Sequence, residues 1–290
     1  MEEVRGVLRE MLYKLGASHY AIIPSERYDT PAIGSPAAAV PTVNKTKSVA
    51  AASPTEPQPP EPPAPRSKGT DASEPEGKII RFANLPELRL HFEARKLPSG
   101  IGYIRFNEFL DPVSIMPKVE TAVRDFAKSP GVIIDLRGNP GGIGIMAMGI
   151  AGFFIADEGK QLGTMTMRDA TLKFVVFPRP ETYDGPLAVL VDGGSASTAE
   201  IFAQGMQDLG RARVLGTLTA GAALPSDIVR LPNGDRFQYA QASYTSVKGR
   251  VLEGNGVVPD EEVRDGAVGL TAGRDLVIEA AENWIAGRRK

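Results

Sequence analysis

The chain has 290 residues, 42% of them hydrophobic and 23% charged, which is an ordinary composition for one large globular domain or two modest ones. The formal net charge of −2 lacks the basic excess typical of proteins that bind nucleic acid or anionic membranes, so we expect neither partner. With no cysteine and only two histidines, the sequence excludes disulfides, a thiolate nucleophile and metal sites built from cysteine or several histidines. We therefore expect no metal and no cofactor.

Residues 1–28, the first of three predicted regions, begin with a helical pattern. Their apolar residues recur at the spacing of one helix face, and Gly16 follows where a C-cap glycine is expected. That face consists of Val4, Val7, Leu8, Met11, Leu12 and Leu15. The stretch "SHYAIIP" after it is predicted to be extended. We expect no signal peptide here, because the start is acidic and amphipathic.

Residues 29–77 have a different composition. Eleven of the chain's 24 prolines lie between Pro31 and Pro75, and no aromatic residue occurs between Tyr28 and Phe82. Such a segment buries too little apolar surface to offset the entropy lost on ordering. We predict a disordered, Pro-rich linker, with a proline-rich ligand for a small recognition domain as the alternative.

Residues 78–288 are predicted to form the core domain, in which short apolar strands alternate with helices. Strands are predicted at 100–106, 131–136 and 187–192, and helices at 115–128, 143–155 and 274–287. The Asn-Gly pair in "PNGD", before "FQYAQASYTSV", favours a tight hairpin. The alternation predicts an α/β fold with parallel strands. No apolar run reaches the roughly 18 residues that a membrane span needs.

The stretch "IIDLRGNPGGIGIMA" predicts a strand, a glycine-rich turn and a helix. Such a turn exposes backbone N–H groups beside the positive end of a helix, which suits an anion or a developing oxyanion. A competing interpretation is the dinucleotide pattern G-x-G-x-x-A at Gly142, Gly144 and Ala147. The pattern is weak, because the acidic residues that would bind the ribose come early, at 157 and 158.

The stretch "VDGGSASTAEIFAQGMQDLG" predicts a second turn between a strand and a helix. Ser197 to Glu200 form a capping box, S-x-x-E before an apolar run, which explains the serine by helix capping alone. A serine at such a corner, beside an N–H-rich loop, is also how several hydrolases expose a nucleophile. The residues by themselves leave both interpretations open.

Together the two turns resemble those of the carboxyl-terminal (tail-specific) processing proteases, in particular the tricorn-core branch. The resemblance covers roughly residues 2–28 and 98–262, and it rests on "GYIRFNEF", "IIDLRGNPGG", "LAVLVDGGSASTAEIFAQGMQDLGRARVLGTLTAGA" and "GNGVVPDEEV". It implies a serine-hydrolase core of stacked ββα units, similar to the crotonase and Clp-protease folds. It also implies Ser197 as the nucleophile, because the family's serine stands three residues before the glutamate that begins the helix.

The resemblance implies further site residues. Gly141 or Gly142 would supply one oxyanion N–H group and Thr198 the other. The lysine branch of the family carries its general base at the position of Ala222, so a Ser–Lys dyad is not expected here. The tricorn branch takes its base from an N-terminal "SH" pair, which is Ser18 and His19 in this sequence.

A glutamate late in the chain orients the machinery of the tricorn branch, and Glu253 matches it, 56 residues after Ser197. His91 lacks a neighbouring motif and is expected to be structural. The Pro-rich segment stands where the family commonly has a peptide-binding PDZ domain, so short peptides or small esters become plausible substrates.

We therefore expect a serine hydrolase that cleaves peptide bonds. The alternatives are a carboxylesterase with the same site, or a relative that binds an apolar ligand without catalysis. Oligomeric state stays open, and so does the compartment: cytoplasmic or, if an upstream signal was removed, periplasmic or extracellular.

Overall fold

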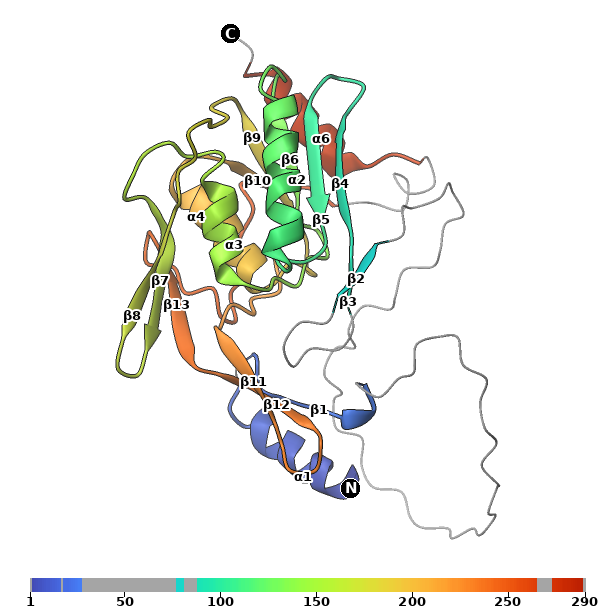
Figure 1. The fold of residues 1–290 in the computed structure, drawn as a ribbon, viewed down its shortest axis with the longest axis vertical. Helices are drawn as coiled ribbons and strands as arrows, with labels where there is room; N and C mark the ends of the chain where they lie inside the picture. Colours follow the sequence, from blue (N-terminus) through green and yellow to red (C-terminus); the bar gives the residue numbers. More distant parts are fainter. Residues whose placement is uncertain (1, 17, 28–76, 81–87, 265–272, 289–290) are drawn as a thin grey trace. The chain divides into compact units, whose positions relative to one another are not determined.

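The computed structural model describes residues 2–16, 18–27, 77–80, 88–264 and 273–288 (Figure 1). These residues belong to one compact unit. The predicted linker, residues 29–77, lies outside the described residues except at its last position. No helix in the described ranges is long and apolar enough to cross a membrane.

A six-stranded sheet forms the centre of the fold. Its strand order is β14 (Glu261–Glu262), β10 (Arg213–Gly216), β9 (Leu187–Val191), β6 (Val132–Asp135), β5 (Gly102–Phe106) and β4 (Phe92–Lys96). All neighbouring pairs are parallel except the antiparallel edge pair β4–β5. The predicted α/β class and the three predicted central strands are confirmed.

Helices cover both faces of this sheet. On one face lie α2 (Pro112–Asp125), α3 (Gly144–Ala151) and α4 (Thr198–Asp208), and on the other lies α6 (Leu276–Ala286) (Figure 1). Successive residues of β6 point to opposite faces of the sheet. Ile134 packs with α2, α3 and α4, and Ile133 packs with α6. Strands buried on both faces are continuously apolar, which is why the sequence predicted them so clearly.

The helix boundaries differ from the prediction by a few residues. The helix predicted at 115–128 begins earlier, at Pro112, where Asp111 caps it by accepting a hydrogen bond from Ser114 N. The helix predicted at 143–155 ends at Ala151. Its apolar continuation, Phe153 to Ile155, is buried as irregular chain and therefore mimics helix in the sequence.

Antiparallel strands outside the central sheet account for the remaining differences between the predicted and the observed elements. A three-stranded sheet of β13 (Ala242–Ser246), β7 (Gln161–Met167) and β8 (Thr171–Val175) was not predicted at β7 and β8. Strands β2 (Lys78–Ile80) and β3 (Leu88–Leu90) also pair. The stretch "FQYAQASYTSV" contains most of β12 (Arg236–Ala240) and all of β13, which belong to different sheets.

An N-terminal lobe combines the first residues of the chain with a hairpin from its second half. It contains α1 (Glu2–Tyr13), the short 3₁₀ helix η1 (Ser25–Arg27) and the sheet β1 (Ala21–Ile23), β12 and β11 (Ser226–Arg230). The predicted hairpin is confirmed, because β11 and β12 pair through the "PNGD" turn. Gly16 has the positive φ of 64° expected of a C-cap glycine.

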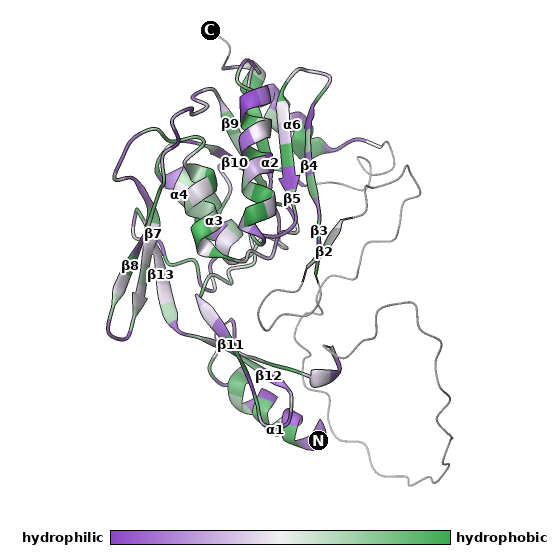
Figure 2. Cartoon of the chain, in the orientation of Figure 1, coloured by the Kyte–Doolittle hydropathy of each residue, from purple (hydrophilic) through white to green (hydrophobic). Residues whose placement is uncertain are grey.

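Helix α1 buries little of its apolar face. Val4, Val7 and Met11 are more than half exposed, and Arg5 is the buried residue of the helix. Figure 2 shows the resulting mixture of hydrophobic and hydrophilic residues along α1. The helix is therefore held in the lobe by a polar contact as much as by apolar packing.

Truncation of Ile134 to alanine tests the central core. Ile134 is 1% exposed, so the loss of its side chain should lower the free energy of unfolding by about 2–5 kcal/mol. Chemical denaturation followed by circular dichroism measures the change. Val113→Ala is the matched control, because Val113 is 83% exposed and its truncation should have little effect.

Candidate active site

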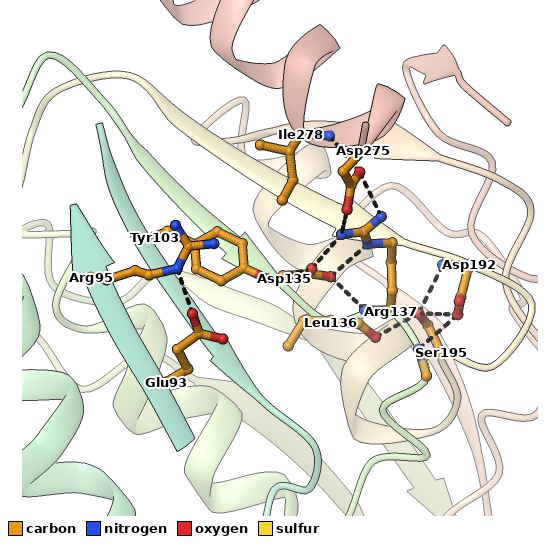
Figure 3. A network of polar contacts seen from close by, with 11 residues as sticks. Glu93, Arg95, Tyr103, Asp135, Leu136, Arg137, Asp192, Ser195, Asp275 and Ile278 are labelled. Carbon is orange, nitrogen blue, oxygen red and sulfur yellow. Dashed lines mark hydrogen bonds and ion pairs between the residues drawn. The ribbon is translucent and has the colours of Figure 1, made fainter. Parts of the chain in front are cut away.

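The glycine turn and the serine turn lie side by side at one edge of the sheet. They follow β6 and β9, which are adjacent parallel strands, so their carboxyl ends meet. Ser195 Oγ donates a hydrogen bond to Leu136 O over 2.8 Å, and Gly138 N donates to Asp192 Oδ1 over 2.8 Å. Figure 3 shows Leu136, Asp192 and Ser195 together. Ser195, the first serine of the S-A-S segment, thus ties the two turns.

A buried polar network holds the residues that come just before the glycine turn. Asp135 is fully buried, accepts a hydrogen bond from Tyr103 Oη over 2.7 Å and pairs with Arg137. Arg137 also pairs with Asp275, the N-cap of α6, over 2.7 Å (Figure 3). These bonds hold the end of β6 against β5 and α6. Sequence analysis gave neither Asp135 nor Arg137 a role.

The glycine turn touches the serine turn through its backbone. Gly141 and Gly142 have φ of 98° and 137°, where residues with a side chain are strained. A Cβ on Gly141 would lie 2.7 Å from both Ala196 O and Thr198 N. Glycine is therefore required at 141 by the close approach as well as by the backbone angle.

The N–H groups of the two turns differ in their partners. Gly141 N donates to Asn139 Oδ1 over 2.8 Å, and Thr198 Oγ1 donates to Gly142 O over 2.7 Å. Within the described ranges the N–H groups of Gly142 and Thr198 have no hydrogen-bond partner. Both can therefore donate to a ligand or to a developing charge.

Ser197 occupies a strained corner at the start of α4. Its φ of 53° and ψ of −120° lie outside the regions that suit a residue with a side chain. Strain of this kind costs roughly 1–3 kcal/mol and persists where the surrounding structure enforces it, often at functional sites. Here Ser197 N donates to Ala222 O over 2.8 Å and to Glu200 Oε2 over 3.0 Å.

Glu200 does more than cap the helix. Its side chain is completely buried, and its carboxylate also accepts hydrogen bonds from Thr219 Oγ1, Gly221 N and Ala222 N over 2.5, 2.8 and 2.9 Å. The capping-box pattern indicated only the local bond to Ser197. The partners 19 to 22 residues further on are a tertiary feature, and through them Glu200 fixes the loop 219–223 beside the serine turn.

Ser18 and His19 lie beside Glu253, although Glu253 follows Ser18 by 235 positions in the sequence. Ser18 Oγ donates to Glu253 Oε2 over 2.9 Å and lies 2.6 Å from His19 Nδ1, while Ser18 N donates to Glu253 Oε1 over 2.5 Å. Because the single Ser18 hydroxyl proton is given to Glu253, His19 Nδ1 must carry a proton and donate to Ser18. His19 Nε2 is then unprotonated and able to accept a proton.

Two consecutive residues connect this group to the serine turn. Ala222 O accepts a hydrogen bond from Ser197 N, and Ala223 N donates to Glu253 Oε2 over 3.1 Å. Ser197 and Glu253 thus bond to neighbouring residues of one short loop, and Ser18 and His19 connect to that loop through Glu253. Within the residues that the structure describes, no hydrogen bond joins His19 to Ser197.

Burial changes the acidity of two groups near the turns. Desolvation lowers the pKa of His19 below its ordinary value, and the negative charge of Glu253 opposes that shift. Glu108, next to Phe109 whose N–H donates to Gly141 O over 2.7 Å, has its pKa raised by burial to about 7. Glu108 lies in the stretch "GYIRFNEF", but sequence analysis gave it no role of its own.

Packing explains the glycines of the dinucleotide pattern. A Cβ on Gly142 would lie 2.4 Å from Phe109 O, and one on Gly144 would lie 2.6 Å from the Phe174 ring. Among the described residues no three His, Asp or Glu side chains are arranged to hold a metal ion. His91, which was expected to be structural, lies between β3 and β4, where its N–H donates to Asn107 Oδ1.

Backbone strain at Ser197 predicts an unusual order of stabilities. Ser197→Gly should be more stable than Ser197→Ala by about 1 kcal/mol, because glycine adopts positive φ without strain. The matched pair is Ala199 and Ala199→Gly in the first turn of α4, where glycine should instead be the less stable residue. Denaturant unfolding of the four proteins compares the two differences, and equal signs would contradict the strain.

The chain is similar to known proteins in both sequence and structure. The carboxy-terminal-processing protease of Bartonella bacilliformis is 27% identical over 194 residues, which are 64% of this chain and 44% of that protein. The carboxyl-terminal-processing protease of Synechocystis sp. is 26% identical over 226 residues, 76% of this chain and 52% of that protein. The chain thus spans about half the length of the curated relatives it matches.

Solved structures share the fold. A protein from Parabacteroides merdae has a TM-score of 0.59 and 24% identity over 67% of this chain and 64% of its own. The tricorn protease has a TM-score of 0.50 and 23% identity over 66% of this chain and 18% of its own. The model of peptidase family S41 matches residues 100–263, which is more than half of the chain and includes both turns. The chain belongs to peptidase family S41.

Proposed function

We propose that this chain is a serine peptidase in which Ser197 is the nucleophile and His19 the general base. The observation that supports this most strongly is the series of hydrogen bonds that joins His19 to Ser18 and Ser18 to Glu253. Glu253 also bonds to Ala223, and the neighbouring Ala222 bonds to Ser197. A serine hydroxyl needs an adjacent base at neutral pH, and histidine is the side chain whose pKa suits that task.

In the proposed reaction, His19 Nε2 accepts the proton of Ser197 Oγ as this oxygen bonds to the substrate carbonyl carbon. The carbonyl oxygen becomes negatively charged and accepts hydrogen bonds from the N–H groups of Gly142 and Thr198. Gly142 is preferred to Gly141, whose N–H already donates to Asn139. The proton on His19 then passes to the leaving amine, and water releases the acyl group from Ser197.

Ser18 and Glu253 are proposed to orient and polarise the base. The hydrogen bond from His19 Nδ1 to Ser18 fixes the tautomer that leaves Nε2 free, and Glu253 stabilises the positive charge that His19 gains during the reaction. Ser18 thus serves as a relay between a carboxylate and an imidazole. The strained backbone of Ser197 would present its Oγ to this group.

Peptides are the proposed substrates. The curated relatives are named carboxy-terminal-processing proteases, but this chain covers about half of their length, so a preference for protein tails does not follow. Esters are cleaved by the same acyl chemistry at the same serine. Short peptides and small esters are therefore the substrate panel that the site favours.

Substitution of the three side chains tests the proposal directly. Ser197→Ala and His19→Ala should each lower kcat for peptide hydrolysis by about 10³-fold or more, because the members of such a unit act together. Glu253→Gln should cost less. A fluorophosphonate probe should label Ser197 in the unsubstituted protein, as read by peptide mapping, and His19→Ala should slow that labelling.

Unchanged hydrolysis by Ser197→Ala would overturn the assignment of the nucleophile. Labelling of no serine, together with binding of apolar ligands, would support a non-catalytic relative. Turnover of p-nitrophenyl esters without turnover of any peptide would identify an esterase instead. Ser195→Ala is not a silent control, because Ser195 ties the turns; Ser99→Ala, remote and exposed, serves that purpose.

The pH profile of kcat/KM should follow the protonation of His19. Because the neutral form is the base and burial lowers its pKa, activity should rise with pH through a midpoint below the ordinary value of about 6.5. Glu253→Gln removes a charge that raises this pKa, so the midpoint should move to lower pH. A shift to higher pH would contradict the proposed contact.

A further inference from the structure

A buried ion pair joins α1 to the tip of the β11–β12 hairpin. Arg5 Nε donates to Asp235 Oδ2 over 2.9 Å and Arg5 Nη2 donates to Asp235 Oδ1 over 2.7 Å, so the contact is bidentate. The two side chains are 7% and 1% exposed. A planar guanidinium that faces a carboxylate in this way fixes direction as well as distance.

Asp235 accepts further hydrogen bonds from other segments of the N-terminal lobe. It accepts hydrogen bonds from Ser25 N and Asn233 Nδ2, each over 2.9 Å, and Arg5 also pairs with Glu26 over 2.9 Å. The hydrogen bonds from Arg5 hold the pKa of Asp235 well below its usual range. The carboxylate therefore stays charged at every pH at which the protein would work.

Both chain segments that flank Ser18 and His19 are attached to this hairpin. Before them, α1 is attached by Arg5. After them, β1 pairs antiparallel with β12, with Ala21 opposite Gln238 and Ile23 opposite Arg236. Since few residues separate α1 from β1, the position of His19 is set by how both elements sit on the hairpin.

The hairpin is in turn continuous with the loop that carries the rest of the site. Ala222 and Ala223, which contact Ser197 and Glu253, lie four and three positions before Ser226, the first residue of β11. Because Asp235 lies in this hairpin, its contact with Arg5 links the position of α1 to the position of that loop. The apolar face of α1 gives little competing support, since it is largely exposed.

We propose that the Arg5–Asp235 ion pair is a positioning device for the catalytic base, which holds His19 in register with Ser197 through α1, β1 and the hairpin. Neither residue contacts the reacting atoms. The proposal rests on the function proposed above, because it assigns His19 as the base. Exposed arginine pairs, such as Arg124 with Glu120, lack this burial and serve for comparison.

The experiment compares Asp235→Asn and Arg5→Lys with Arg124→Lys as the control. Asp235→Asn keeps the shape of the side chain and loses its charge, and Arg5→Lys keeps the charge and loses the bidentate geometry. Both should lower kcat for peptide hydrolysis by roughly 10- to 100-fold with KM little changed, because small misplacements of a catalytic group have effects of this size. Arg124→Lys should leave kcat unchanged.

The pH profile separates misplacement of the base from simple loss of folded protein. A loosened segment admits water to His19, so its pKa should return upward toward the ordinary value, and the acid limb of kcat/KM should move to higher pH. This is opposite to the shift expected for Glu253→Gln. A smaller folded fraction would scale the activity without moving the limb.

A disulfide provides an independent rescue. Directly opposed antiparallel residues lie roughly 4.5–5.5 Å apart at Cα, within the range of a disulfide. The pair Ala21→Cys and Gln238→Cys, introduced into Asp235→Asn, would lock β1 onto β12 in a chain that has no other cysteine. Oxidation should recover most of the lost kcat and the original acid limb, and reduction should abolish the recovery.

Two failures are distinguishable. If Asp235→Asn and Arg5→Lys keep the unsubstituted kcat and acid limb while His19→Ala is inactive, the positioning role is wrong and the proposed function stands. If they lose activity only in proportion to unfolded protein, with the acid limb unmoved, the positioning role is also wrong. If His19→Ala is fully active, both proposals fail.

Discussion

The hydrogen bonds between the turns that follow β6 and β9 are the constraint on which the rest of the site depends. Parallel pairing brings the ends of the two strands together, and Ser195 with Asp192 then ties one turn to the other. Gly141 has to be glycine because the serine turn lies against it. The same contacts between the two turns hold the residues on both sides of Ser197, so the strained backbone of Ser197 persists.

A second set of contacts supplies what the two turns lack. They present a hydroxyl and free N–H groups but no base, and the imidazole arrives from the N-terminal lobe through Ser18 and Glu253. Glu200 holds the loop between these groups from within the core. The proposed reaction therefore needs residues from the N-terminal segment and from the second half of the chain, and under this proposal the lobe with its buried ion pair would be part of the site.

Sequence reasoning succeeded where a pattern has one physical cause. Continuous apolar runs identified the central strands, because burial on both faces leaves no alternative composition. It was less accurate where local preference and packing disagree. Strands β7 and β8 are partly exposed and lack a continuous apolar run, so they resemble loops in the sequence, whereas the buried chain after Ala151 resembles helix. The break between β12 and β13 lies at a single residue, Gln241, which no composition rule marks.

The sequence by itself determined the α/β class, the two turns and the types of residue available for chemistry, because strand burial, glycine and capping act over a few neighbouring positions. Only the tertiary structure decided that Ser18 and Glu253 meet, that Arg5 is buried against Asp235, and that, among the described residues, the N–H group of Gly142 rather than that of Gly141 lacks a partner. These contacts join residues up to 235 positions apart. Chain folding selects such pairs through the register and direction of whole elements, which local composition does not encode.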